Sequence, residues 1–240
     1  MESGGFGRLD VFYPGAHIFG KAGERCDHDS EIAFEAGHSG PDRVLAWAGH
    51  WRAGYRTGGP HWVLEYNYES GDKNPNDGRQ GGFTAPYPSN HDRNGLADQV
   101  GWKNIHHIRT GVEVKVRSEW KLVFNMHNYW LASAADGLFT PANLQLARVE
   151  HGARSRRMGW EPDISAQWTP HAPLQFSVSY ARLIPGAFLR EAAPGVAYNY
   201  SYCFAGYRFR CLVGRTPWSA AGPPAGLFSS PVLANEFSIC

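Results

Sequence analysis

Basic side chains recur at alternate positions in several apolar stretches of this chain, as expected for one wet face of a β-strand. The basic members of this face are Arg52, Arg109, Lys115, Arg117 and Lys121. A ring of cations in a low-dielectric wall focuses its electric field on an anion that passes through it. We therefore expect these residues to line an aqueous path, and all except Arg52 to form one cluster on two neighbouring strands.

Acidic and neutral polar residues share this face. The acids are Glu31, Glu35, Glu65, Glu69, Glu113, Glu161 and Asp163, and the neutral polar residues include His127 and Tyr129. Tyr129 is expected to face the lumen, which makes it a better candidate to contact a sugar in transit than the aromatic residues of the apolar face. Seven acids against five bases favour a second interpretation, in which opposite charges pair across strands and keep the wall rigid. An anion path and a paired wall both stay open on the sequence.

A polar segment carries oxygen ligands at spacings that suggest Ca²⁺. These residues are Asp72, Asn74, Asn76 and Asp77. Calcium prefers carboxylate and amide oxygens, but the segment lacks the bidentate Glu of an EF-hand loop and Pro75 interrupts it. Asn and Asp before Gly are also ordinary turn formers. The sequence suggests no cofactor other than calcium at this segment, and a plain turn is the alternative.

Other patterns point away from enzymatic chemistry. His106 and His107 are adjacent in a predicted strand and so point to opposite faces, which prevents them from sharing a metal site. Glu161 and Asp163 face the same way, as the carboxylates of a glycosidase would, but they lie in a predicted wall. GxSxG and glycine-rich phosphate-binding motifs are absent from the sequence. We expect no enzymatic activity.

The candidate residues lie in segments whose apolar residues recur with a period of two. Trp62, Leu64 and Tyr66 share one face and Glu65 lies on the other. This period is typical of β-strands with one apolar and one wet face. Nine strands are predicted: Arg8 to Tyr13 with a continuation toward Phe19, Ser30 to Gly37, Val44 to Tyr55, His61 to Ser70, Ile105 to Arg117, Trp120 to Ala132, Met158 to Trp168, Pro173 to Leu183 and Tyr200 to Phe209.

The connections between these strands alternate in length. The connections 57–60, 118–119 and 169–172 are tight, whereas 71–104, 133–157 and 185–199 are long. Outer-membrane barrels have short periplasmic turns and long outer loops, whereas Greek-key sandwiches mix loop lengths. The sequence therefore predicts an all-β, antiparallel, up-and-down transmembrane barrel of porin type. It is incomplete, because nine strands are an odd number and single-chain bacterial barrels have an even one.

Aromatic residues on the apolar face support a membrane setting. They are Trp47, Trp51, Tyr55, Trp62, Tyr66, Tyr68, Trp120, Trp130 and Trp168, and we expect them to form girdles at the two interfaces. A mean hydropathy of −0.42 is compatible with a barrel, because half of each strand faces water. Lys+Arg 23 against Asp+Glu 22 leaves no strongly basic surface for nucleic acid. The alternative is a secreted carbohydrate-binding β-sandwich that uses exposed tryptophans.

Three stretches resemble a known family. They are NYESGDKNPNDG (67–78), YPSNHDRNGLADQVGWKNIHHIRTGVEVK (87–115) and FLREAAPGVAYNYSY (188–202), and they are similar to the alginate export family of bacterial outer-membrane β-barrels. The similarity covers roughly Ser30 to Phe209. It implies a porin-like barrel of more strands, surrounded by outer-membrane lipid, that passes an anionic polysaccharide or small solutes. It does not specify periplasmic export partners.

The two ends of the chain depart from a complete outer-membrane protein. No signal peptide follows Met1, so we expect that N-terminal strands and a leader precede this sequence in the gene. Residues 1–209 are interpreted as the C-terminal portion of the barrel. Residues 210–240 are rich in Pro, Gly, Ala and Ser, and we interpret them as a non-barrel tail that arose by read-through or a frameshift.

Overall fold

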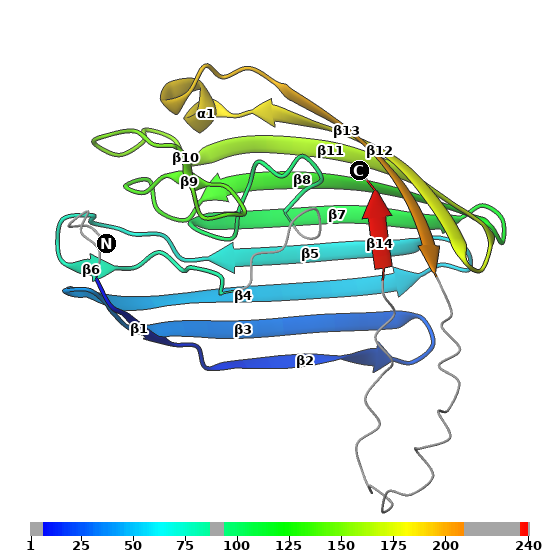
Figure 1. The fold of residues 1–240 in the computed structure, drawn as a ribbon, viewed down its shortest axis with the longest axis horizontal. Coiled ribbons are helices and arrows are strands. Elements are labelled where there is room, and N and C mark those ends of the chain that lie inside the picture. The colour runs from blue at the N-terminus through cyan, green and yellow to red at the C-terminus, as the bar shows by residue number, and fades with distance from the viewer. Residues whose placement is uncertain (1–6, 87–93, 209–235, 240) are drawn as a thin grey trace, which may run out of the picture.

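The computed structural model describes residues 7–86, 94–208 and 236–239. Twelve strands form one curved sheet in the order β1-β3-β4-β5-β7-β8-β11-β12-β13-β14, with β2 also beside β3 and β6 beside β4 (Figure 1). Their bounds are β1 Leu9–Phe12, β2 Gly15–Ala22, β3 Cys26–Ser39, β4 Asp42–Arg56, β5 His61–Glu69, β6 Arg79–Gln80, β7 Ile105–Lys115, β8 Trp120–Leu131, β11 Arg157–His171, β12 Leu174–Pro185, β13 Tyr198–Arg208 and β14 Glu236–Ile239. Strands β9 (Leu138–Phe139) and β10 (Gln145–Ala147) form a separate pair, and α1 spans Ala187–Ala192.

The long strands follow one another in chain order and pair antiparallel, which confirms the predicted up-and-down topology. Among the described residues, the first and last strands of the sheet do not pair with each other, so the barrel is incomplete as predicted. Residues 236–239 are the described part of the predicted tail, and β14 lies beside the end of β13. The rest of the tail lies outside the described residues, and the boundary at 209 stays a prediction.

The nine predicted strands are present with two differences at the start of the chain. The first is divided into β1 and β2, which pair with opposite ends of β3. Pro14 lies at the break, where its missing N–H and fixed φ interrupt the ladder. Strand β3 also begins at Cys26 and not at Ser30. The alternation did not predict this extension, because Asp27 is polar. In the structure its carboxylate is satisfied by Arg52 at 2.9 Å and by His61 at 2.8 Å.

The connections sort to the two ends of the sheet. The turns β2–β3, β4–β5, β7–β8 and β11–β12 lie at one end, whereas β6, β9, β10 and α1 lie at the other (Figure 1). The predicted alternation of short and long connections from β4 onward is therefore confirmed. The β3–β4 turn is short as well, and Gly40 takes a φ of 60° there. Within the described part of the chain, no helix is long and apolar enough to cross a bilayer.

One face of the sheet, called the outer face here, carries the predicted apolar residues. Side chains of β5 alternate between buried and exposed, with Trp62 51% and Leu64 56% exposed. The Trp120 and Trp168 rings stack at 5.8 Å near the short-turn end. Trp130 lies ten residues along β8 from Trp120, which spans about 33 Å of strand and about 25 Å across a bilayer at the usual tilt. This single sheet with an exposed apolar face differs from the two facing sheets of a β-sandwich.

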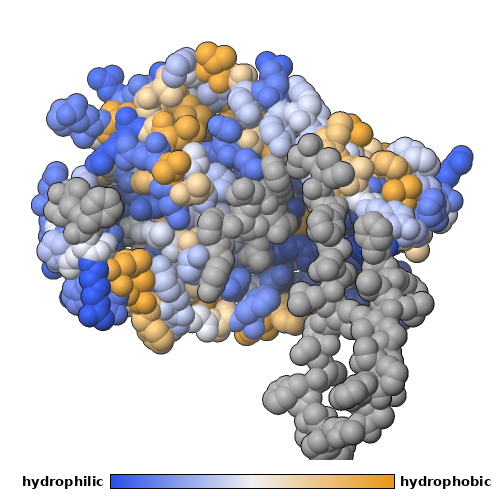
Figure 2. Space-filling view, viewed as in Figure 1, coloured by the Kyte–Doolittle hydropathy of each residue, from blue (hydrophilic) through white to orange (hydrophobic). Residues whose placement is uncertain are grey.

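The opposite face, called the inner face here, is partly covered by the connection between β5 and β7. The described parts of this connection lie over the sheet in Figure 1, and Figure 2 shows hydrophilic residues among hydrophobic ones on the same side. Phe83 packs on Ala46 and Ala48 of β4, and its ring meets Tyr13 edge-on at 6.2 Å. A second apolar cluster lies toward the long loops, where Phe188 of α1 is buried with other residues of the sheet and loops. The connection is thus a packed part of the fold.

Candidate functional site

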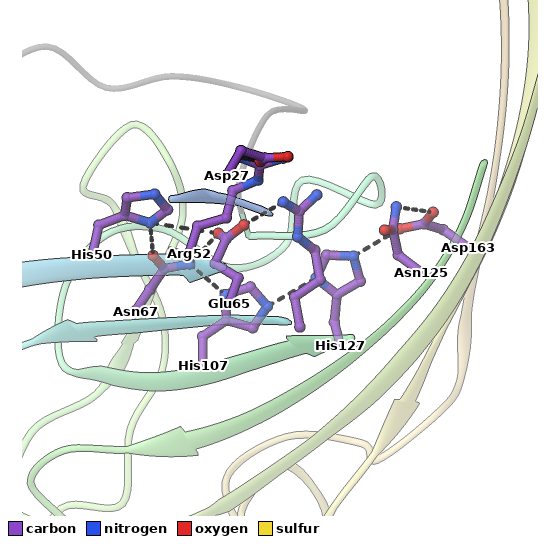
Figure 3. A network of polar contacts seen from close by, with 10 residues as sticks. Asp27, His50, Arg52, Glu65, Asn67, His107, Asn125, His127 and Asp163 are labelled. Atoms are coloured by element: carbon purple, nitrogen blue, oxygen red, sulfur yellow. Dashed lines mark hydrogen bonds and ion pairs between the residues drawn. The ribbon is translucent and has the colours of Figure 1, made fainter. Parts of the chain in front are cut away.

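A continuous chain of polar contacts crosses the inner face from β4 to β11 (Figure 3). His50 Nδ1 lies 2.6 Å from Asn67 Oδ1, and Asn67 Nδ2 lies 2.9 Å from His107 Nδ1. His107 Nε2 is 2.8 Å from His127 Nδ1, and His127 Nε2 is 2.8 Å from Asp163 Oδ2. All five side chains are buried. The spacing follows from strand geometry, because side chains at alternate positions of neighbouring strands share a face.

The donors and acceptors of this chain determine the histidine tautomers. The Asn67 amide nitrogen can only donate, so His107 accepts at Nδ1 and donates from Nε2. His127 therefore accepts at Nδ1 and donates from Nε2 to Asp163. Asn125 Nδ2 donates to the other oxygen of this carboxylate at 2.9 Å. The ordered direction indicates two neutral imidazoles, and the chain runs around the wall instead of along a path through it.

Three of the predicted lumen cations form ion pairs with acids on other strands. Arg109 contacts Glu65, whose side chain is only 1% exposed, and Asn67 Nδ2 donates to the same carboxylate at 2.7 Å. The other two pairs are Arg52 with Asp27 at 2.9 Å and Lys121 with Glu113 at 2.9 Å. For these cations the contacts agree with the paired-wall interpretation. Their role in a substrate path stays a prediction.

The remaining two predicted cations lie at the short-turn end. Lys115 is the last residue of β7 and lies opposite Lys121 in register, and Arg117 follows in the turn. Both are exposed, and within the described residues neither forms an ion pair. The predicted cluster is therefore extended along the strands, with Arg109 in the middle of β7 and the unpaired cations at its end.

The connection between β5 and β7 is tied to the inner face through its backbone. Glu35 Oε2 accepts a hydrogen bond from Thr84 N at 2.7 Å, and Glu161 Oε1 accepts one from Ala97 N at 3.0 Å. Tyr129 donates its hydroxyl hydrogen to Asn94 O at 3.0 Å. These contacts bridge residues between 35 and 64 positions apart. A loop of the same chain thus covers part of the inner face.

This loop changes the surroundings of two predicted path residues. His127 and Tyr129 lie on the inner face, as the alternation predicts, but both are buried. Strand periodicity could not reveal this, because it assigns a face and not the path of a loop above it. The one sequence feature that fits this close approach is the glycine at position 95. In the structure Gly95 has a φ of +91° and approaches the Tyr129 hydroxyl and the Glu161 carboxylate so closely that a Cβ would overlap them.

The predicted calcium segment forms a series of side-chain-capped turns. Asp72 Oδ1 accepts from Asn74 N at 3.0 Å, and Asp77 Oδ1 accepts from Arg79 N at 3.0 Å. Asn74 Oδ1 lies 3.4 Å from Asn76 N. Such Asx turns are the alternative use of these residue types. Among the described residues, no group of three or more His, Cys, Asp and Glu side chains is placed to hold a metal ion. Calcium binding through the Asn and Asp oxygens stays a prediction, which retention of calcium after desalting and its loss in Asp72→Ala would test.

Comparison with protein families agrees with this architecture. The family model described as alginate export matches residues 7–204, from the start of β1 into β13. The chain belongs to the alginate export family. This confirms the resemblance noted in the sequence and extends it toward the N-terminus. The alginate export family is a transport family of the outer membrane, so its members have a general export or channel role. No curated protein was found to match the chain.

Proposed function

We propose that this chain forms the wall of an outer-membrane channel for anionic polysaccharide or small solutes. The observation that carries the proposal is the opposite chemistry of the two faces of one sheet. The outer face exposes Trp62, Leu64 and Trp120, whereas the inner face holds Glu65 and Arg109 in a network of charges and hydrogen bonds. Lipid on one side and water on the other is the environment that stabilises this arrangement.

The unpaired cations at the short-turn end are the best candidates to attract an anion. Lys115 and Arg117 are exposed, whereas Arg109 is held by a buried carboxylate. A cation that is already paired with a carboxylate exerts little electric field on a more distant solute, because the fields of the two opposite charges largely cancel. We therefore assign the attraction of a polyanion mainly to these two residues, with Arg52, Arg109 and Lys121 maintaining the wall.

The loop on the inner face determines how much of this wall a solute meets. Residues 94–97 cover Tyr129 and His127. A passing sugar can contact these two side chains only when the loop moves away, which breaks the hydrogen bonds from Tyr129 to Asn94 O and from Ala97 N to Glu161. With the loop in place, the solute meets the loop and the uncovered part of the inner face. The proposed path therefore has a narrow section beside β8 and β11 and a wider, basic section near the β7–β8 turn.

Conductance of the full-length protein in planar bilayers tests this proposal. Mannuronate or guluronate oligomers should block the current. The block should weaken by about a hundredfold in the Lys115→Gln, Arg117→Gln double variant, since each lost charge contact with an anion costs about 1.5 kcal/mol, or about tenfold in affinity. Arg182→Gln is the matched control, because this exposed arginine lies on the outer face. A current that the oligomers do not block would instead indicate a general porin. A protein that does not fractionate with the outer membrane would contradict the proposal.

A further inference from the structure

A pocket of about 380 Å³ opens at the long-loop end of β4 and β5. Its apolar part is formed by Leu45, Trp47 and Tyr68, and the last two rings pack against each other at 4.4 Å. These residues belong to the outer face, since the strand alternation places them with Trp51 and Leu64. The pocket therefore opens toward the surroundings of the sheet and not toward the inner face.

The outward residues of β4 change character as the strand leaves the membrane band. Starting from Trp51 and moving toward the long loops, the larger ones are Trp47, Leu45 and then Arg43. The loop after β5 adds two more cations, Lys73 and Arg79, to the pocket lining. An apolar wall ends here in a cationic rim, in the same order as the acyl chains and the phosphates of a membrane lipid.

Two of these cations are direct neighbours. Arg43 of β4 and Arg79 of β6 are register partners in a short parallel pair, and Arg43 N donates to Gly78 O at 2.9 Å. Like charges directly opposite each other destabilise a strand pair. Within the described part of the chain, no carboxylate forms an ion pair with Arg43, Arg79 or Lys73. An anion between the two guanidinium groups would relieve this repulsion and could accept bidentate hydrogen bonds.

The pocket also contains Asp72 and Asp77, which limit its net charge. Each of these carboxylates already accepts a backbone N–H of its own loop, from Asn74 and Arg79 respectively. Three cations against two carboxylates leave an excess of one positive charge. Because their turns hold both carboxylates in place, the part of the pocket beside Arg43 and Arg79 is the part that suits an anion.

We infer that this pocket binds the phosphorylated sugar headgroup of an outer-leaflet glycolipid. Arg43 and Arg79 hold the phosphate, the Trp47 and Tyr68 rings contact the sugar, and Leu45 borders the first part of an acyl chain. A glycolipid fits better than a free phosphate, because the apolar lining continues into the lipid-facing surface of the sheet. This inference rests on the proposed outer-membrane location.

Binding of purified lipid A to the full-length protein in detergent, followed by native mass spectrometry, tests the inference. Bis-phosphorylated lipid A should remain bound, and its affinity should fall by about tenfold or more in Arg43→Gln, Arg79→Gln, because charge-assisted contacts with phosphate are lost. The control variant Arg182→Gln removes an exposed outward charge at the same end of β12 and should bind as the wild type does. Heat-modifiable electrophoretic mobility shows that each variant is folded.

Three results would overturn the inference. Equal binding of lipid A and its dephosphorylated form would remove the role of the cations. Competition by millimolar inorganic phosphate as effective as that by lipid A would indicate a phosphate site without a lipid. Equal loss in Arg182→Gln and in the pocket variant would indicate nonspecific charge attraction. Conductance and oligosaccharide block, measured on the same preparations, separate failure of this site from failure of the proposed channel, because the pocket lies on the outer face.

Discussion

The imidazole Nε2 of His107 lies 2.8 Å from Nδ1 of His127, and the two ring planes are within 4° of parallel. Each ring is neutral and has one donor and one acceptor, and each uses both within the chain that ends at Asp163. A buried polar group whose hydrogen bonds are all formed stabilises one register of neighbouring strands, whereas a partly satisfied network destabilises it. This pair therefore aligns β7 with β8 on the inner face.

Substitution of His127 by Gln should destabilise the protein. A Gln amide cannot reproduce both ring contacts, so His107 Nε2 or one Asp163 oxygen loses its partner while buried. The expected loss is about 1–3 kcal/mol for each unsatisfied group. Urea unfolding followed by tryptophan fluorescence measures it. His171→Gln is the control, because this exposed histidine at the end of β11 should change stability by less than about 0.5 kcal/mol. Equal stability of both variants would refute the proposed register role.

Arg109→Gln should be strongly destabilising, because it leaves the Glu65 carboxylate buried without its cation. Breaking a buried pair from one side costs about 3–5 kcal/mol. The double variant with Glu65→Gln should recover much of this loss, since the uncompensated charge is then absent. A denaturation midpoint for Arg109→Gln that matches the wild type would show that solvent already screens the pair.

Gly95→Ala should detach the loop from the inner face. The added Cβ would overlap the Tyr129 hydroxyl and the Glu161 carboxylate, and alanine also disfavours a φ of +91° by about 1–2 kcal/mol. Hydrogen exchange at the Ala97 amide, which donates to Glu161, should become about tenfold faster or more.

Gly78→Ala provides the control for this substitution. Gly78 has a φ of +71°, and no atom lies within 4 Å of the point that a Cβ would occupy, so alanine there carries the backbone cost alone. Exchange at Ala97 should be unchanged in this variant. An equal effect of both substitutions would show that overlap with Tyr129 and Glu161 does not hold the loop in place.

Asp136 should make the contact between two long loops dependent on pH. Its Oδ2 accepts from Asp72 N and its Oδ1 from Gly137 N, both at 2.8 Å, and burial raises the pKa of its carboxyl above the ordinary 3.8. A raised folded-state pKa means that the unfolded chain ionises first. The contribution of Asp136 to stability is therefore fully present below pH 3.8 and is lost as pH rises through the raised pKa.

The variant Asp136→Asn separates this group from the other titrating residues. Asparagine cannot ionise, so the free energy of unfolding of the wild type relative to Asp136→Asn should decrease as pH rises above 3.8. Chemical denaturation of both proteins at a series of pH values measures the difference. A difference that is constant with pH would contradict the role assigned to Asp136.

Much of the fold could be predicted from local patterns. The alternation around Trp62 and Glu65 assigned both faces of β5 correctly, and the tight connections at 57–60 and 118–119 located two turns at one end of the sheet. The alternation failed where polar residues occupied a strand, as at Asp27, because the partners that satisfy such a carboxylate lie on other strands. It also could not show the division at Pro14, where both pieces still pair with β3.

A backbone period of two is a property of each strand alone, so the amino-acid order already contained the strands, their wet and apolar faces and the alternation of their connections. The partners of the charges were a different matter. Glu65 meets Arg109 from 44 positions away, Arg43 of β4 pairs in register with Arg79 of the two-residue strand β6, and the Ala97 amide donates to Glu161 on the inner face. Such contacts depend on strand register and loop path, which many weak interactions over the whole sheet set together. Only folding brings these side chains within reach of one another.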